Sequence, residues 1–181
     1  MALADKYAAG ACGSSAAGVQ GVAELDLVST PSGAADIVVS PAASGGTVAG
    51  IINRTSAASR ILAMAVVRDA SLAQRITSLL WQQHNTNWQL VTEYCGAGYA
   101  RFDEATLQFC RQMASQQLYL EPIYSGKALA GLFSLIAAGQ IPAGSRLSFF
   151  HTGGLQGLAG LHYRNLITAT DYALLSGSGV C

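Results

Sequence analysis

Charged residues are scarce in this sequence. Only 11% of the 181 residues are Asp, Glu, Lys or Arg, and the formal net charge is zero. Nucleic-acid-binding proteins need clustered lysine and arginine to neutralise phosphates, so the sequence predicts no nucleic-acid partner. With 51% hydrophobic residues, there is also little charge to cover the surface of a lone globule. We therefore expect a buried partner surface and a homo-oligomer.

Long hydrophobic runs and paired cysteines are also missing. The longest apolar stretch, 128–138, is interrupted by Gly131 and Ser134 and is too short to cross a bilayer. The amino terminus lacks the charged start and apolar core of a signal peptide. The four cysteines are scattered, without the spacing of a zinc or redox site. These absences predict a cytoplasmic protein with reduced thiols, no bound metal and no membrane partner.

The sequence does contain a regular alternation of apolar runs and helical patterns. Runs at 36–39, 61–67, 88–91 and 147–150 predict strands, most of them buried. Between them, helices are predicted over 14–25, 47–54, 71–83, 103–116 and 126–138. Strands that alternate with helices indicate an α/β fold with a mostly parallel sheet and flanking helices. After Gly160 the pattern is weaker, and we take 161–181 as a carboxyl-terminal tail.

Serine residues at helix starts and glycines inside a helix give two further expectations. Ser14 or Ser15 is expected to cap the first helix, and Ser125 the last, because a serine hydroxyl can accept a backbone N–H. Gly18 and Gly21 lie inside the first helix, where each costs about 1 kcal/mol relative to alanine. We therefore expect a neighbouring backbone to approach this helix closely.

The first candidate site is Ser44-Gly45-Gly46-Thr47, between an expected strand and an expected helix. Glycines let backbone N–H groups surround an anion, the helix amino terminus adds a favourable potential, and two hydroxyls can donate. The pattern indicates a phosphate site. No lysine follows as in a Walker loop, however, and the dinucleotide spacing is incomplete. A glycine turn followed by a helix cap explains the same residues equally well.

The second candidate site combines the turn at Tyr124-Ser125 with residues 151–154 (His-Thr-Gly-Gly), which follow the last strand. Open α/β sheets bind ligands at the carboxyl ends of their strands. Tyr99, in a glycine-rich loop, is a further candidate. Each of these also has a plain structural explanation, as a helix cap, a strand-end turn and an amphipathic ring at a rim.

A resemblance connects these segments. Residues 121–131 (EPIYSGKALAG) and 150–155 (FHTGGL) resemble the carboxyl-terminal signature of a pyridoxal-phosphate-dependent family that comprises D-cysteine desulfhydrases and 1-aminocyclopropane-1-carboxylate deaminases. Residues 44–50 resemble its phosphate loop, and 10–21 the glycine-rich loop and helix before it. The resemblance implies an amino-acid-metabolising enzyme of fold type II (tryptophan synthase β-like), a homodimer with pyridoxal 5'-phosphate as cofactor and a small amino acid as substrate. Residues 1–160 would then form most of the larger, cofactor-binding domain.

The resemblance also implies roles for individual residues. Residues 44–47 would hold the cofactor phosphate, Tyr99 and Tyr124 match catalytic tyrosines, Ser125 matches the position facing the pyridine nitrogen, and Thr152 a position lining the substrate pocket. The deaminases have Glu and Leu at the last two positions, so two hydroxyls favour a desulfhydrase. A serine leaves the ring nitrogen largely neutral, which suffices when a leaving group as good as thiolate sits on the β-carbon.

The lysine that carries the cofactor in this family lies in an amino-terminal segment without a counterpart here. Lys6 and Lys127 are the only lysines, and neither lies in the family's Ser-Gly-Asn-Lys context. We therefore expect an amino-terminal part of the enzyme to be missing and this chain alone to be inactive. The leading hypothesis is a portion of a D-cysteine desulfhydrase-like lyase, which forms pyruvate, ammonia and sulfide by β-elimination.

Three other hypotheses remain open from the sequence. One is a 1-aminocyclopropane-1-carboxylate deaminase, and another is a non-catalytic module or pseudo-enzyme that binds a phosphate ligand. The last is a nucleotide-binding α/β domain that uses residues 44–47. The lack of an acidic residue in a clear ribose-binding position counts against it.

Overall fold

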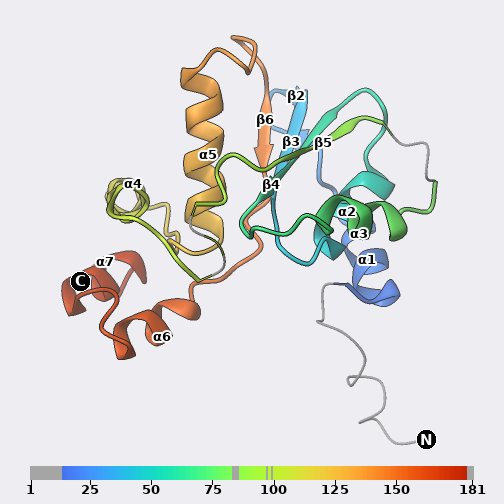
Figure 1. The fold of residues 1–181 in the computed structure, drawn as a ribbon. Helices are drawn as coiled ribbons and strands as arrows, with labels where there is room; N and C mark the ends of the chain where they lie inside the picture. The colour runs from blue at the N-terminus through green and yellow to red at the C-terminus, as the bar shows by residue number, and fades with distance from the viewer. Residues whose placement is uncertain (1–13, 83–85, 97, 99, 179–181) are drawn as a thin grey trace, which may run out of the picture.

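The computed structural model describes residues 14–82, 86–96, 98 and 100–178. Helices and strands alternate along the chain, as predicted, and the α/β class is confirmed (Figure 1). In order they are α1 (Ala16–Ala23), β1 (Ser29–Thr30), β2 (Gly33–Ala34), β3 (Ile37–Ala42), α2 (Gly46–Arg54), β4 (Arg60–Ala65), α3 (Leu72–Ser78), β5 (Trp88–Val91), α4 (Glu104–Ala114), α5 (Ser125–Ala137), β6 (Leu147–Phe149), α6 (Gly157–Tyr163) and α7 (Ala169–Leu175).

Four strands form one parallel sheet in the order β5-β4-β3-β6, while β1 and β2 form a separate antiparallel hairpin. β3 lies between β4, with Ile37 opposite Arg60, and β6, with Ile37 opposite Leu147. Because the four strands run in the same direction, their carboxyl ends lie at one edge of the sheet. The loops that follow them, including 43–45 and 150–156, therefore begin at that edge, which positions the candidate site.

Three strands differ from the prediction in extent or burial. β4, expected over 61–67, spans Arg60–Ala65. β3 continues through Pro41 to Ala42 instead of ending at Val39. Proline cannot donate a ladder hydrogen bond. It is tolerated here because the pairing between β3 and β6 ends at Val39, before Pro41 is reached. β6 was expected to be buried but is half-buried, because it lies at the edge of the sheet.

Helices cover both faces of the sheet (Figure 1). α4 and α5 pack with Val39 and Leu62 in one buried cluster, and α1, α2 and α3 pack with Val38 and Ile61 in another. Alternate residues of the same strand thus face opposite layers. Burial of one such aliphatic side chain stabilises the fold by about 1.5–3 kcal/mol. Two-sided burial explains why the strands are continuous apolar runs in the sequence.

The close helix contact expected near α1 exists, but the glycine that permits it lies in α2. Gly21 is exposed, and a Cβ there would meet no described atom within 4 Å. A Cβ on Gly50 of α2 would instead lie 2.6 Å from Cβ of Val22 and 2.7 Å from the carbonyl oxygen of Val19. The expectation for Gly21 was therefore wrong, and Gly50 is the residue that lets the two backbones meet.

α3 ends at Ser78, earlier than the helix predicted over 71–83. The side chain of Asn53, at the end of α2, replaces the helical hydrogen bonds beyond this point. Its Nδ2 donates to the carbonyl of Leu79 at 3.3 Å, and its Oδ1 accepts from the amide of Trp81 at 3.0 Å. A partner distant in sequence thus ends the helix, which local periodicity does not reveal.

The segment after Gly160 is helical and packed. α6 begins at Gly157, so the expected boundary at residue 160 falls inside a helix, and α7 packs against α4. Nε of Arg111 donates to Oδ1 of Asp171 at 2.7 Å, which joins α4 to α7. Asp171 also forms a capping box with Thr168 at the start of α7.

None of the helices in the described ranges is long and apolar enough to span a membrane. Within the same residues, no three His, Cys, Asp or Glu side chains gather where they could hold a metal ion. Cys95 and Cys110 are buried free thiols, and burial raises the pKa of Cys110 to about 12.

Candidate functional site

The loop between β3 and α2 contains the first group of predicted site residues. Gly45 occupies the N-cap position of α2 with φ of 93°, a left-handed conformation that favours glycine. A Cβ at this position would also lie 2.9 Å from Cγ1 of Ile76 on α3. No described side chain caps α2, so its first N–H groups are available at the edge of the sheet. With the hydroxyls of Ser44 and Thr47, this is an arrangement in which helix amino termini bind anions.

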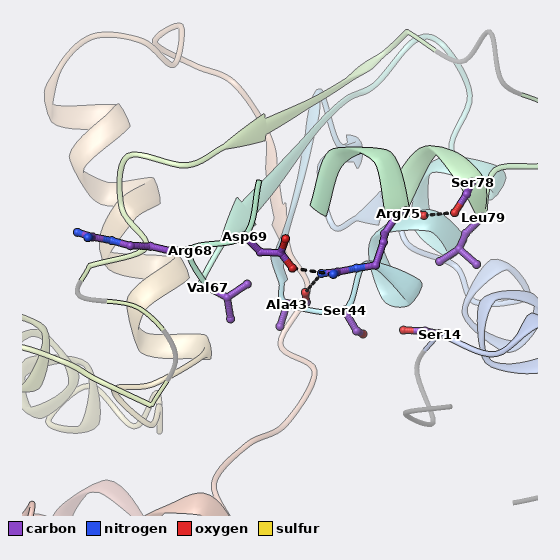
Figure 2. Close-up of a pocket in the computed structure, with 9 residues that line it drawn as sticks. All are labelled: Ser14, Ala43, Ser44, Val67, Arg68, Asp69, Arg75, Ser78 and Leu79. Atoms are coloured by element: carbon purple, nitrogen blue, oxygen red, sulfur yellow. Dashed lines mark hydrogen bonds and ion pairs between the residues drawn. The ribbon is translucent and has the colours of Figure 1, made fainter. Parts of the chain in front are cut away.

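Ser44 lines a cavity of about 700 Å³ beyond the carboxyl ends of β3 and β4 (Figure 2). The wall consists of Ser14, Ala43, Ser44, Val67, Arg68, Asp69, Arg75, Ser78 and Leu79. Oγ of Ser14 is buried and has no hydrogen-bond partner among the described residues, and Figure 2 shows this side chain directed toward Ser44. Because a buried hydroxyl without a partner is costly, Ser14 fits a site where an oxygen-rich ligand such as a phosphate supplies that partner.

An ion pair that sequence reasoning missed lies in the wall of this cavity. Nη1 of Arg75 is 2.6 Å from Oδ2 of Asp69, and Nη2 of Arg75 donates to the carbonyl of Ala43 at 3.1 Å. Hydrogen bonds from the hydroxyl and amide of Ser71, then from Arg75, lower the pKa of Asp69 to about 2. Asp69 is therefore an anion at neutral pH. A local signal did exist, because Asp69 lies two residues after the strand expected at 61–67 and Arg75 lies six residues beyond it.

Tyr124 connects the turn before α5 with the end of β3. Its phenol donates to the carbonyl of Pro41 at 3.3 Å, and the side chain of Thr152 lies near it. Burial raises the pKa of Tyr124 above its ordinary value, the nearby Thr152 side chain lowers it, and the Glu121 carboxylate raises it further. The phenol is therefore protonated at neutral pH and can donate a hydrogen bond or a proton.

Glu121, and not Ser125, caps α5, which corrects the sequence prediction. Ser125 is the first residue of the helix, and Tyr124 occupies the N-cap position without a side-chain cap bond of its own. The Glu121 carboxylate accepts the backbone amides of Ile123 at 2.7 Å, Tyr124 at 3.0 Å and Ser125 at 2.6 Å. Glu121 is only 2% exposed, and this burial raises the pKa of its carboxyl group against the lowering effect of the amides.

Ser125 is fully buried beside this carboxylate. Its Oγ is 3.1 Å from Oε1 of Glu121 and accepts weakly from the Glu121 amide at 3.4 Å. Its hydroxyl proton is therefore directed to Glu121. Contact between Oγ and a ligand ring would need the neighbouring chain to shift.

The turn at 151–154 lies next to the same carboxylate. Nδ1 of His151 accepts from the Gly153 amide at 3.1 Å, so Nε2 carries the proton and donates to the Tyr119 carbonyl at 3.1 Å. Gly154 has φ of 111°, and a Cβ there would lie 3.0 Å from Oε1 of Glu121. The exposed Thr152 is thus held near Tyr124 by a turn that needs glycine.

The structure therefore brings three of the predicted site residues together. Tyr124 and Ser125 contact Glu121, and Thr152 lies beside the Tyr124 phenol. The same phenol reaches Pro41, three residues before Ser44. Contact with the loop at 44–47 runs through β3 and not directly from Ser125. Tyr99 lies outside the described residues.

Lys127 is a buried cation that the sequence analysis treated only as a helix-start residue. It is 4% exposed, and its Nζ donates to the carbonyls of Val66 at 3.4 Å, Cys95 at 3.1 Å and Gly98 at 3.0 Å. Burial lowers the pKa of its ammonium group, while Cys95 and Glu121 raise it. Lys127 thus ties the loops after β4 and β5 to α5. The signal for a buried role is that it is the single charge in the stretch 126–138.

Comparison with known proteins identifies the family of this chain. A family model described as "Pyridoxal-phosphate dependent enzyme" matches residues 3–153, most of the chain. The match covers the loop at 44–47, the turn before α5 and the turn up to Gly153. It confirms the family resemblance noted in the sequence.

Several curated relatives share parts of the chain. A 1-aminocyclopropane-1-carboxylate deaminase of Ralstonia pickettii (strain 12J) is 39% identical over 70 residues, which is 38% of this chain and 21% of the relative. A D-cysteine desulfhydrase of Salmonella paratyphi C (strain RKS4594) is 31% identical over 105 residues, 58% of this chain and 32% of the relative. A D-cysteine desulfhydrase of Klebsiella pneumoniae (strain 342) is 28% identical over 166 residues, 83% of this chain and 51% of the relative. The chain spans about half or less of the length of these relatives.

Proposed function

Since the chain belongs to the family of pyridoxal-phosphate dependent enzymes, we propose that it forms the cofactor-binding part of a D-cysteine desulfhydrase-like lyase. The reaction is D-cysteine plus water giving pyruvate, ammonia and hydrogen sulfide. Two observations support this choice over a deaminase. Ser125 and Thr152 bear hydroxyls where the resemblance places Glu and Leu in the deaminases, and a desulfhydrase matches 83% of this chain.

The loop at 44–47 is proposed to hold the phosphate of pyridoxal 5'-phosphate. Its support is the amino terminus of α2, which no described side chain caps, the left-handed Gly45, and Oγ of Ser14 in the adjoining cavity, which is buried without a partner among the described residues. When bound, the cofactor supplies an electron sink for the bond broken at the substrate α-carbon. Ser14, Ser44 and Thr47 would donate hydroxyl hydrogen bonds to the phosphate oxygens.

Tyr124 is the residue to which we assign proton transfer, with Tyr99 as a second catalytic tyrosine. Its placement is the observation that carries the proposal, because one phenol meets the end of β3 at Pro41 and the turn at Thr152. Burial keeps the phenol protonated, so Tyr124 can deliver a proton or hold one that is leaving. Thr152, exposed beside it, is assigned to the substrate pocket. Ser125 is assigned to the side of the ring nitrogen, a role that requires the neighbouring chain to shift when the cofactor binds.

The polypeptide alone is proposed to bind cofactor without turnover. Of its two lysines, Lys127 is 4% exposed and its ammonium group donates to three carbonyls, an environment that does not offer a reactive amine. Lys6 lies outside the described residues. The same observation favours a second candidate function, a non-catalytic module that binds a phosphate ligand.

One experiment separates these readings. The protein is mixed with pyridoxal phosphate and D-cysteine or 1-aminocyclopropane-1-carboxylate, alone and with the amino-terminal half of the Klebsiella relative, and sulfide, pyruvate and 2-oxobutanoate are measured. We expect no product alone, and sulfide and pyruvate from D-cysteine in the mixture. Tyr124→Phe should lower that rate by about 10²–10⁴-fold with cofactor affinity retained.

Other outcomes would contradict the proposal. Formation of 2-oxobutanoate in excess of pyruvate would assign a deaminase. Cofactor binding without any product in the mixture would favour the non-catalytic module. Pyruvate from the polypeptide alone, or borohydride reduction that fixes the cofactor to Lys127, would overturn the argument from the lysines.

A further inference from the structure

The side chain of Arg75 lies beside the start of the loop formed by residues 44–47. The backbone of α3 closes the outer side of this loop, since a Cβ on Gly45 would lie 3.6 Å from the backbone nitrogen of Ile76. Arg75 precedes Ile76, and its Nη2 donates at 3.1 Å to the carbonyl of Ala43, the residue before Ser44. The guanidinium therefore lies where a phosphate at residues 44–47 would have a cation within electrostatic reach.

The same guanidinium is paired with an anion. Asp69 lies in the wall of the same cavity, and its Oδ2 is 2.6 Å from Nη1 of Arg75. Ser71 holds the other carboxylate oxygen with both its amide, at 2.8 Å, and its hydroxyl, at 2.7 Å. The remaining charge in the wall is Arg68, whose Nε donates to the Gly96 carbonyl, and Figure 2 shows it directed away from Arg75. Arg75 and Asp69 are therefore the charges that an anion beside Ser44 meets.

We propose that Arg75 is the cationic phosphate-binding group of this site and that Asp69 limits the affinity by neutralising it. The inference rests on the proposed assignment of residues 44–47 as the cofactor phosphate loop. That loop lacks the lysine found after the glycines of a Walker sequence, so its own residues supply only dipoles and hydroxyls. A phosphate monoester is a dianion at neutral pH, and Arg75 offers the fork geometry that binds phosphate oxygens.

The pair predicts opposite effects of two neutralising substitutions. Arg75→Gln removes the cation and leaves Asp69 uncompensated, so the dissociation constant for pyridoxal phosphate should rise about tenfold, which corresponds to about 1.4 kcal/mol. Asp69→Asn releases the guanidinium and removes an anion from the wall, so the same constant should fall about three- to fivefold. Both differences should shrink as salt is added.

The test measures equilibrium binding to the polypeptide by titration calorimetry, with pyridoxal phosphate, inorganic phosphate and pyridoxal as separate ligands. The two substitutions should change the affinity for the two phosphate ligands and leave that for pyridoxal, which has no phosphate, unchanged. Arg75→Lys keeps the charge without the fork and should retain most of the affinity. Arg54→Gln removes an equal charge at the far end of α2, about 12 Å along the helix, and should have little effect.

A variant of the loop at residues 44–47 separates failure of this inference from failure of the proposed function. Thr47→Val removes one predicted phosphate hydroxyl without changing any charge. If Thr47→Val weakens phosphate binding but Arg75→Gln does not, Arg75 has no role and the loop assignment stands. If Asp69→Asn weakens binding as much as Arg75→Gln, the pair acts as a structural unit and the proposal is overturned. If Thr47→Val leaves the affinity unchanged, the loop assignment itself is wrong.

Discussion

Removal of the Glu121 carboxylate should destabilise the protein strongly, because among the described residues it is the acceptor for the Ile123, Tyr124 and Ser125 amides at the start of α5. Oε2 accepts the Ile123 and Tyr124 amides, and Oε1 accepts the Tyr124 and Ser125 amides and contacts the Ser125 hydroxyl. A buried donor left without a partner costs about 1–3 kcal/mol. Glu121→Ala exposes at least two such donors to an apolar surrounding, so we expect a loss of about 3–4 kcal/mol in the free energy of unfolding.

Glu121→Gln permits a finer test. With its amide oxygen in the place of Oε1, glutamine keeps the bond to the Ser125 amide. Its NH₂ group then faces the Ile123 amide, which is also a donor. These two facing donors lack an acceptor, which should lower the free energy of unfolding by about 2 kcal/mol, about half the effect of Glu121→Ala. This intermediate value follows from the acceptor count of the carboxylate and not from side-chain volume.

Urea denaturation followed by tryptophan fluorescence measures these differences as shifts of the midpoint at constant slope. Glu104→Gln is the matched control, since the Glu104 side chain is 75% exposed and its ion pair with Arg111 lies at the surface. Its effect should stay within about 0.5 kcal/mol. Equal effects of Glu104→Gln and Glu121→Gln would refute the assignment of Glu121 as the cap.

The pH dependence gives an independent check on Glu121. Burial raises the pKa of its carboxyl group in the folded protein above the ordinary value of 4.5. A raised folded pKa means that the folded state keeps the proton longer than the unfolded state. The stability from this group is therefore fully present below about pH 4.5 and is lost as the pH rises through the folded value. Glu121→Gln should abolish this decline, and a decline that persists unchanged would assign it to another group.

Three further predictions address packing and buried charge. Gly50→Ala should cost more than about 2 kcal/mol through the clash with α1, whereas Gly21→Ala should stabilise α1 by about 0.5–1 kcal/mol, both measured by denaturation. The hydrogen bond from Arg111 lowers the pKa of Asp171 to about 2 from an ordinary 3.8. Asp171 should therefore contribute about 2 kcal/mol to the free energy of unfolding above pH 3.8, and this contribution is lost as the pH falls through about 2. Asp171→Asn should flatten that part of the acid-unfolding curve. Lys127→Met leaves three carbonyls without their donor and should lower the free energy of unfolding by about 2–4 kcal/mol, measured by denaturation. An unchanged free energy of unfolding would show that water replaces the ammonium group.

Much of the fold was accessible from local sequence patterns. Continuous apolar runs located the parallel strands, and Ser15, one of the two expected caps of α1, accepts the Gly18 amide with its hydroxyl at 3.1 Å. The cap of α5 was also local, since Glu121 bonds amides two to four residues ahead. It was missed because Ser125 is the more usual type of cap residue. Prediction failed where a distant side chain intervened, as with Asn53 at the end of α3.

The sequence by itself determined the alternation of strands and helices, the family, and the glycine turn that begins α2, because each depends on the order of residues within short segments. Only the tertiary structure decided what the buried charges do. Lys127 donates to carbonyls up to 61 residues away in sequence. Arg75 donates to a carbonyl 32 residues away, and Asp69, in the loop before α3, forms an ion pair with Arg75. Every residue has a backbone carbonyl, so the sequence pattern does not reveal which carbonyls a buried cation will contact. That choice is made when the parallel strands bring their carboxyl ends to one edge of the sheet.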